Sequence, residues 1–189
     1  MKLKILIAGD SFAADWTTKY NQLGWPNMLA NDFDVTNVAQ AGCGEYKILL
    51  QIKSQDLSCY DAVILSHTSP YRLHTLWHPV HNQDLLHHNS DFLYADVAAH
   101  GIKSIQEYFE KYFDLNHAQF VHNLICKEIA ELVKPIPHVH MAHMDYSYQF
   151  DNFLNCEPIY RQHPGFQNHY SDHGNTLIFE AVKNRLVNM

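Results

Sequence analysis

An apolar run that breaks at a glycine opens the chain: Leu3-Lys4-Ile5-Leu6-Ile7-Ala8-Gly9-Asp10-Ser11-Phe12-Ala13. A short apolar run that ends at a turn residue predicts a buried strand of a parallel sheet. Gly9 permits a tight exit, so Asp10 and Ser11 would follow the carboxyl end of that strand, where open α/β sheets bind ligands. Asp and Ser are also common in turns and helix caps, so the tripeptide alone leaves a structural role open for both.

The composition is that of a globular protein without affinity for nucleic acid. Hydrophobic residues make up 47% of the 189 residues, enough for a continuous core. The net charge of -7 comes without a basic cluster, so we expect no nucleic-acid partner. No apolar run approaches the ~20 residues of a membrane span, and the N-terminal run does not resemble a signal peptide. The cysteines form no CxxC pair, so we expect reduced thiols in a cytoplasmic protein: Cys43, Cys59, Cys126 and Cys156.

Segments with strand and helix patterns alternate along the chain. Apolar runs predict strands over residues 3–8, 33–38, 60–65 and 139–144. Helical spacing predicts helices over residues 12–21, 45–54, 102–113, 117–133 and 174–187. This alternation predicts an α/β fold, a three-layer α/β/α sandwich around a parallel sheet. We expect one domain over residues 1–189, with an irregular, lid-like insertion at about 71–100 and an irregular segment over 145–164.

Three loops and one later segment converge on the same edge of the predicted sheet. Each loop follows a strand: Asp10-Ser11, Ala41-Gly42-Cys43 and Thr68-Ser69. His169 lies in the segment before the last predicted helix. A serine hydroxyl needs an adjacent base to act as a nucleophile, and imidazole suits that role. An oxyanion needs preorganised donors, often backbone N–H groups beside glycine, so the chain contains the parts of an acyl-transfer site.

The order of these residues resembles the SGNH/GDSL hydrolase superfamily. The resemblance rests on Gly9-Asp10-Ser11, on Asn37 with Gly42 five residues later, and on His169-Tyr170-Ser171-Asp172-His173-Gly174-Asn175. Gly24-Trp25-Pro26 is similar to the usual surroundings of these motifs in the family, and the likeness extends from Ile5 to Val182. It implies a flavodoxin-like sheet and a serine enzyme that cleaves or transfers acyl groups. It also implies that Ser11 is the nucleophile, that His169 is the base, and that the N–H groups of Ser11 and Gly42 bind the oxyanion.

Two positions depart from the family pattern. The third motif usually supplies an Asn as another oxyanion donor, but here the loop reads His67-Thr68-Ser69-Pro70, so the hydroxyl of Ser69 or Thr68 is the expected substitute. The family acid, three residues before the histidine, is replaced by Phe166. Because that acid holds the imidazole tautomer and stabilises its cation, we expect a backbone carbonyl or a carboxylate such as Asp172 to orient His169. Asp10 is expected to fix the nucleophile loop through hydrogen bonds.

Histidines crowd two regions of the chain. One region holds His67, His74, His78, His81, His87 and His88, and the other holds His138, His140 and His143. Zinc sites use histidines at short spacings, but the chain contains no HExxH motif. We therefore expect no metal and no cofactor, and we interpret the first region as a polar lid over the substrate groove, in which Tyr71, Trp77 and Tyr94 could stack on sugar rings.

These observations predict a metal-independent ester hydrolase with a Ser11–His169 centre. By analogy with the family, the expected substrate is a small acyl ester, such as an acetyl ester, on a carbohydrate or another small molecule. Two alternatives stay open. One is an acyltransferase with the same centre, in which a sugar hydroxyl replaces water. The other is a non-catalytic carbohydrate-binding protein of the same fold, which the altered third motif and the missing acid would favour.

Overall fold

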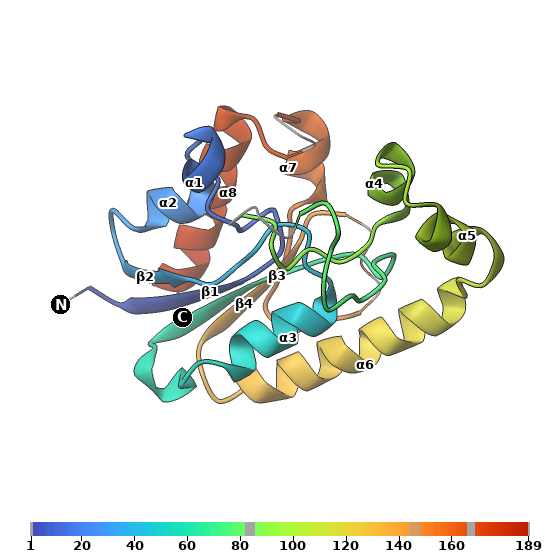
Figure 1. Ribbon diagram of the computed structural model, residues 1–189. Coiled ribbons are helices and arrows are strands. Elements are labelled where there is room, and N and C mark those ends of the chain that lie inside the picture. The colour runs from blue at the N-terminus through green and yellow to red at the C-terminus, as the bar shows by residue number, and fades with distance from the viewer. Residues whose placement is uncertain (1, 82–85, 145, 147, 166–168, 189) are drawn as a thin grey trace.

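The computed structural model describes residues 2–81, 86–144, 146, 148–165 and 169–188. Its centre is a five-stranded sheet in the order β2-β1-β3-β4-β5, and every neighbouring pair is parallel (Figure 1). The strands are β1 (Lys4–Gly9), β2 (Asp34–Asn37), β3 (Ala62–His67), β4 (His138–Ala142) and β5 (Phe153–Asn155). The predicted parallel sheet is confirmed, and its carboxyl edge carries the loops after β1, β2 and β3.

Helices cover both faces of the sheet (Figure 1). They are α1 (Thr17–Tyr20), α2 (Trp25–Leu29), α3 (Glu45–Lys53), the 3-10 helix η1 (Leu57–Cys59), α4 (Tyr94–Ala99), α5 (Lys103–Lys111), α6 (Leu115–Val133), α7 (Glu157–Gln162) and α8 (Asp172–Val187). Helices α3 and α6 lie on one face, and α2 and α8 lie on the other. The predicted three-layer α/β/α sandwich is therefore confirmed. None of these helices combines the length and the apolar composition of a membrane span.

The apolar run of β1 supplies both hydrophobic cores. Successive side chains of a strand point to opposite faces of the sheet. Ile5 and Ile7 pack in the core beneath α2 and α8, whereas Leu6 and Ala8 pack in the core beneath α3 and α6. All four side chains are fully buried. Burial on both faces explains why this strand reads as a continuous apolar run instead of an alternating one.

The segments predicted to be irregular contain some regular structure. Residues 145–164, expected to be irregular, include β5 and α7, while α4 lies within 71–100. The helix predicted over 12–21 is shorter, because only Thr17–Tyr20 is helical. Strand β5 spans three residues at the sheet edge, which is too short for a periodic signal to show.

All four cysteines are free thiols, and all except Cys59 are buried. Burial raises the pKa of Cys43 to about 12 and that of Cys156 to about 12. Both thiols are therefore protonated near neutral pH and cannot act as nucleophiles there. Cys43, which follows Gly42 in the chain, is a packing residue.

Candidate active site

A cavity of about 350 Å³ lies at the carboxyl edge of the sheet. Its walls bring together Ser11 from the loop after β1, Gly42 from the loop after β2, and His169 from the segment before α8. These three residues are far apart in the chain, and they meet because parallel strands end at the same edge. The remaining lining residues are mostly polar or aromatic: Trp16, Lys19, Tyr20, Arg72, His81, His87, Ser90, Asp91, Leu93 and Asp96.

The loop that carries Ser11 is held by its own backbone, by the side chain of Asp10 and by the indole of Trp16. The Ala13 N–H donates to the Asp10 carbonyl at 3.1 Å, and the Phe12 N–H donates to Asp10 Oδ1 at 3.1 Å. The Trp16 indole N–H donates to the Ser11 carbonyl at 2.7 Å. Asp10 therefore fixes the loop through hydrogen bonds. Within the described residues neither the N–H nor the hydroxyl of Ser11 forms a hydrogen bond, so both are available to a ligand.

Gly42 occupies a position that excludes any side chain. Its φ is +78°, in the left-handed region that favours glycine. A Cβ atom at Gly42 would lie 2.3 Å from Ser90 Oγ, so the backbone also approaches its neighbour too closely for alanine. The Gly42 carbonyl accepts hydrogen bonds from the Asp91 N–H and from Arg72 Nη1. In the part of the chain that the structure describes, the Gly42 N–H donates to no group, so it can serve as an oxyanion donor.

A backbone clamp positions His169. The Gly165 N–H donates to the His169 carbonyl at 2.7 Å, and the Ser171 N–H donates to the His163 carbonyl at 2.9 Å. A Cβ atom at Gly165 would lie 2.3 Å from the Tyr170 carbonyl oxygen, so only glycine fits the clamp. The imidazole ring packs against two aromatic rings at centroid distances of 4.7 Å (Phe12) and 4.5 Å (Trp16). The ring therefore reaches the cavity from a supported position.

Ser11 and His169, the candidate nucleophile and base, are not in direct hydrogen-bond contact in this structure. No hydrogen bond joins Ser11 Oγ to His169 among the described residues, although both line the same cavity. Such contacts are often long before substrate binds and tighten in the complex. Asp172, the carboxylate considered for orienting His169, is exposed in the first turn of α8, and its side chain forms no hydrogen bond with any residue that the structure describes. Phe166, at the position of the family acid, lies outside the described residues.

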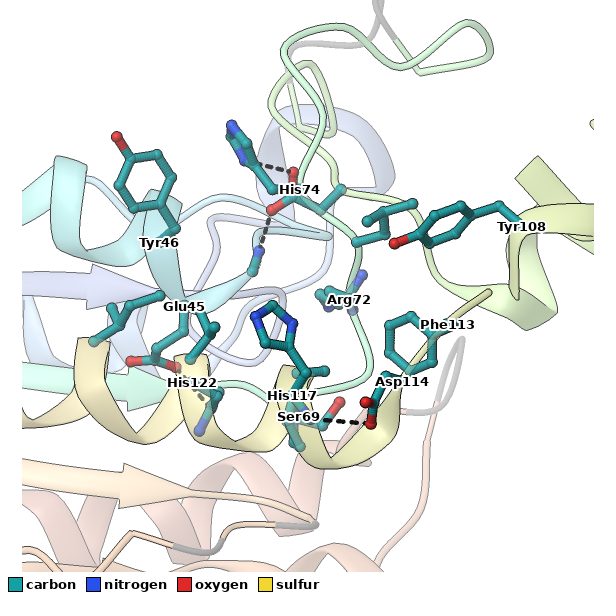
Figure 2. A pocket seen from close by; sticks show the side chains of 17 residues that line it. Glu45, Tyr46, Ser69, Arg72, His74, Tyr108, Phe113, Asp114, His117 and His122 are labelled. Atoms are coloured by element: carbon teal, nitrogen blue, oxygen red, sulfur yellow. Dashed lines mark hydrogen bonds and ion pairs between the residues drawn. The ribbon is translucent and has the colours of Figure 1, made fainter. Parts of the chain in front are cut away.

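Thr68 and Ser69 do not line the cavity of Ser11. Ser69 lines a second cavity of about 240 Å³ between α3, α5 and α6, shown in Figure 2. Thr68 Oγ1 accepts a hydrogen bond from Arg72 Nε at 3.3 Å, and the Thr68 N–H donates to Glu45 Oε2 at 3.2 Å. The loop after β3 thus carries both hydroxyl groups away from Ser11, in contrast to the placement expected from the sequence.

Arg72 is the cationic residue that this loop presents to the Ser11 cavity. Its side chain lines both cavities, and Nη1 donates to the Gly42 carbonyl at 3.0 Å. Burial raises the pKa of the neighbouring Asp10 carboxyl, and the charge of Arg72 partly offsets that rise. Sequence reasoning did not identify Arg72. The sequence does single it out, because no other Lys or Arg lies between Lys53 and Lys103.

A chain of buried polar groups runs behind Ser11. Ser66 Oγ donates to Asp10 Oδ1 at 3.0 Å and lies 2.9 Å from His143 Nε2, while His143 Nδ1 contacts the Tyr170 hydroxyl. Since Ser66 has one hydroxyl proton, His143 Nε2–H is the donor to Ser66, and Nδ1 accepts from Tyr170. Burial holds the pKa of His143 well below its usual range, consistent with a neutral ring. With these donor and acceptor roles, each of the buried groups has a hydrogen-bond partner, and an oxygen of Asp10 accepts from the Ser11 loop.

The free energy of unfolding is expected to depend on pH through the titration of Asp10. Burial raises the pKa of Asp10 from 3.8 to about 6, so the folded state binds this proton more tightly than the unfolded state. The stability contribution of Asp10 is full below pH 4 and falls as the pH rises to about 6, by roughly 3 kcal/mol in total. Asp10→Asn keeps an acceptor oxygen for Ser66 and the Phe12 N–H but removes the titration. Urea denaturation from pH 4 to 7.5 should show the variant gaining about 3 kcal/mol relative to wild type. Parallel stability curves would show that the Asp10 pKa is ordinary.

A buried ion pair stands beside the second cavity. Glu45 Oε1 lies 2.6 Å from His67 Nδ1, and Glu45 Oε2 lies 3.5 Å from His122 Nε2. Burial would raise the pKa of Glu45, but the charge of His67 and the hydrogen bonds of both histidines hold it well below its usual range. Two ligands of one tetrahedral zinc ion lie ~3.3 Å apart, so the 2.6 Å separation is that of a hydrogen-bonded ion pair. His67, in the third motif, therefore has a structural role.

Asp91 anchors the described part of the segment 71–100. Its carboxylate accepts hydrogen bonds from the Gly44 N–H at 2.8 Å and the Thr75 N–H at 2.9 Å. The same carboxylate forms a buried ion pair with Lys47 at 2.8 Å, and the Asp91 N–H donates to the Gly42 carbonyl at 2.9 Å. The base of this segment is thus fixed to α3 and forms one wall of the Ser11 cavity.

No protein-family model matches the chain, and no curated protein matches it. Two solved structures are similar at low identity. An inferred lipolytic protein of the G-D-S-L family from Desulfitobacterium hafniense DCB-2 is 14% identical with a TM-score of 0.40, over 97% of this chain and 99% of that chain. An inferred acylhydrolase from Bacteroides fragilis NCTC 9343 is 9% identical with a TM-score of 0.40, over 98% of this chain and 86% of that chain. Likeness of this degree assigns no residue roles, so the function proposed below depends on the geometry of the site itself.

Proposed function

We propose that the protein is a serine hydrolase that cleaves small acyl esters, with Ser11 as the nucleophile and His169 as the base. The observation that carries the proposal is a pair of backbone donors. The N–H groups of Ser11 and Gly42 are not used by the described residues, and they border the cavity that the Ser11 hydroxyl and His169 also line. A cavity that combines a hydroxyl, an imidazole and two free N–H donors suits acyl transfer.

In the proposed reaction Ser11 Oγ attacks the ester carbonyl, and His169 accepts the hydroxyl proton. The negative charge on the carbonyl oxygen is held by the N–H groups of Ser11 and Gly42. His169 then gives the proton to the departing alcohol, and an acyl group stays on Ser11. Water, deprotonated by His169, attacks this acyl-enzyme, and the acid leaves when the Ser11 oxygen recovers its proton.

Arg72 is the proposed third group that stabilises the oxyanion. Its guanidinium lies in the same cavity and is held by the Gly42 carbonyl and Thr68 Oγ1. A guanidinium carries five N–H donors, so these two contacts leave others for a ligand. A fixed cation near developing negative charge lowers the barrier most where water is excluded. This assignment replaces the hydroxyl groups of Thr68 and Ser69 as the substitute for the family Asn.

The shape of the site favours a small acyl group and a polar alcohol. Beside Ser11 and His169 lies a side pocket of about 20 Å³, also lined by Phe12 and Trp16. A space of this size holds roughly one water- or methyl-sized group, which suits an acetyl methyl. The larger cavity, with Trp16 and charged side chains in its walls, suits a carbohydrate alcohol. Tyr71, Trp77 and Tyr94, expected to stack on sugar rings, do not line it.

The proposal is tested by kinetics on p-nitrophenyl esters of increasing acyl length. We expect the acetate to be hydrolysed with the highest kcat/KM and the octanoate at least about tenfold more slowly, because each methylene that the side pocket excludes costs binding energy. Acetylated sugars should be deacetylated in the same preparation. Added sugar alcohols distinguish the acyltransferase, which would form new esters. Failure of the folded protein to cleave any of these esters would favour the carbohydrate-binding alternative.

The same assay examines Arg72 with a matched control. Arg72→Met should lower kcat by about 10²-fold with a smaller change in KM, since the lost interaction acts on the transition state. Arg161→Met, an equivalent change on α7 away from the cavity, should retain wild-type kcat. Equal kcat values for both variants would remove Arg72 from the proposed mechanism.

A further inference from the structure

Three side chains of the histidine-rich region meet beside the Ser11 cavity. His78 Nε2 lies 3.2 Å from Asp96 Oδ2, and His81 Nε2 lies 3.3 Å from the same oxygen. Both histidines come from the turn that follows Trp77, and Asp96 comes from α4. His81 and Asp96 also line the cavity of Ser11, so the cluster forms part of its wall.

The ligand atoms of His78, His81 and Asp96 all lie within 4.8 Å of one another, close enough to share one ion. Zinc binds imidazole nitrogen and carboxylate oxygen at ~2.0–2.2 Å, which places two ligand atoms of a tetrahedron ~3.3–3.5 Å apart. The separations of 3.2 and 3.3 Å come close to that value. They are longer than the ~2.7–2.9 Å of a charge-assisted hydrogen bond. In the buried Glu45–His67 pair, by contrast, the atoms are 2.6 Å apart.

The buried ring of His78 supplies an independent observation. The residue is 0% exposed, and its Nε2 atom forms no hydrogen bond among the described residues despite its closeness to Asp96. Buried polar atoms are nearly always satisfied by a partner. A metal ion between His78, His81 and Asp96 would supply that partner.

His100 holds the carboxylate from the other side. Its Nδ1 atom lies 2.9 Å from the Asp96 carbonyl oxygen and 3.1 Å from Asp96 Oδ1. Oδ2 faces His78 and His81, and His81 Nε2 also lies 3.4 Å from Oδ1. Hydrogen bonds that orient a metal-binding side chain are typical of metal sites.

We propose that His78, His81 and Asp96 bind a divalent cation of the zinc class, with the fourth ligand position open to a water molecule or to an oxygen atom of a ligand in the cavity. Two histidines and one carboxylate, with the fourth position held by water or substrate, form the ligand set of catalytic zinc sites. This inference departs from the absence of metal expected from the sequence. It goes beyond the proposed hydrolase function and does not depend on it.

Metal binding has a structural consequence in the turn 78–81. His78 Nδ1 lies 3.3 Å from the N–H of Val80 and 3.3 Å from the N–H of His81, and accepts both. Coordination through Nε2 moves the ring proton to Nδ1, because a neutral imidazole carries one proton. Both contacts then end, and the two N–H groups turn toward other acceptors. The amide resonances of Val80 and His81 are therefore expected to shift when zinc binds.

The test is a calorimetric titration of the full-length, chelator-treated protein with zinc chloride at pH 7.5. Wild type is expected to bind one ion, and His81→Gln and Asp96→Asn should weaken its affinity by about 100-fold or more. His88→Gln, the same chemical change in the same region but outside the cluster, should bind zinc like wild type. Far-ultraviolet circular dichroism establishes that each variant is folded.

Two results would overturn the metal site. One is a folded wild-type protein that takes up no zinc. The other is zinc uptake that His81→Gln and Asp96→Asn leave unchanged, which would mean adsorption to scattered histidines. Amide shifts at Val80 and His81 in wild type that are absent from Asp96→Asn would locate the ion at this cluster, while shifts confined to other residues would contradict it.

Discussion

Replacing Ser11 with alanine is expected to reduce kcat for p-nitrophenyl acetate by at least about 10³-fold while leaving the protein folded. The reason is that the Ser11 hydroxyl is the atom that would bond to the acyl group. It forms no hydrogen bond among the described residues, so its removal breaks no structural contact. The free energy of unfolding should change by less than about 1 kcal/mol. A stopped assay and urea denaturation on the same preparations measure both quantities.

The control for this variant is Ser69→Ala, which removes a hydroxyl from the second cavity. It should keep wild-type kcat, since Ser69 does not line the cavity of Ser11. If Ser11 were only a turn or capping residue, Ser11→Ala would lose about 1 kcal/mol of stability and keep its activity. That pattern would refute the nucleophile assignment.

His169→Gln is expected to lower kcat by about 10²- to 10⁴-fold, because glutamine cannot accept the proton from Ser11. Glutamine keeps an amide of similar size between the rings of Phe12 and Trp16, so the packing around position 169 is largely retained. The pH dependence of kcat near neutrality should disappear together with the imidazole. The measurement is the pH–rate profile of wild type and variant from pH 5 to 9.

His173→Gln provides the matched control for His169. His173 lies exposed in the first turn of α8, where its ring packs against His163 at 4.7 Å. It does not line the cavity of Ser11, so its replacement should leave kcat unchanged. The opposite result, an inactive His173→Gln and an active His169→Gln, would show that His173 and not His169 is the base.

The architecture could be predicted from the sequence because its main elements are strongly patterned. The run Ile5 to Ala8 is apolar at every position because both faces of β1 are buried, and the helices α3, α6 and α8 carry clear apolar faces. Strand β5 and helix α7 gave no comparable signal, since they are short and lie among aromatic and polar residues. Their positions depend on packing against β4 and α8, which a local pattern does not record.

Parts of the candidate site could be predicted from the sequence where one residue carries a distinctive local chemistry. Ser11, Gly42 and His169 could be selected from their motifs, and the structure brings all three to one cavity. The contribution of the loop after β3 was not predictable, because which side chain reaches the cavity depends on the path of that loop. Arg72 lies only three residues beyond Ser69, yet the loop directs Ser69 into the second cavity and Arg72 toward both. The cluster of His78, His81 and Asp96 could not be predicted either, because Asp96 reaches the two histidines only through the position of α4.

The activation of Ser11 is tested most directly by intact-protein mass spectrometry after treatment with a fluorophosphonate. We expect one covalent adduct per wild-type chain, mapped to Ser11 by peptide sequencing. Labelling should be absent from Ser11→Ala and strongly slowed in His169→Gln, while Ser69→Ala is labelled like wild type. A folded wild-type protein that forms no adduct, or an adduct located at another residue, would contradict the assignment of Ser11 as the nucleophile.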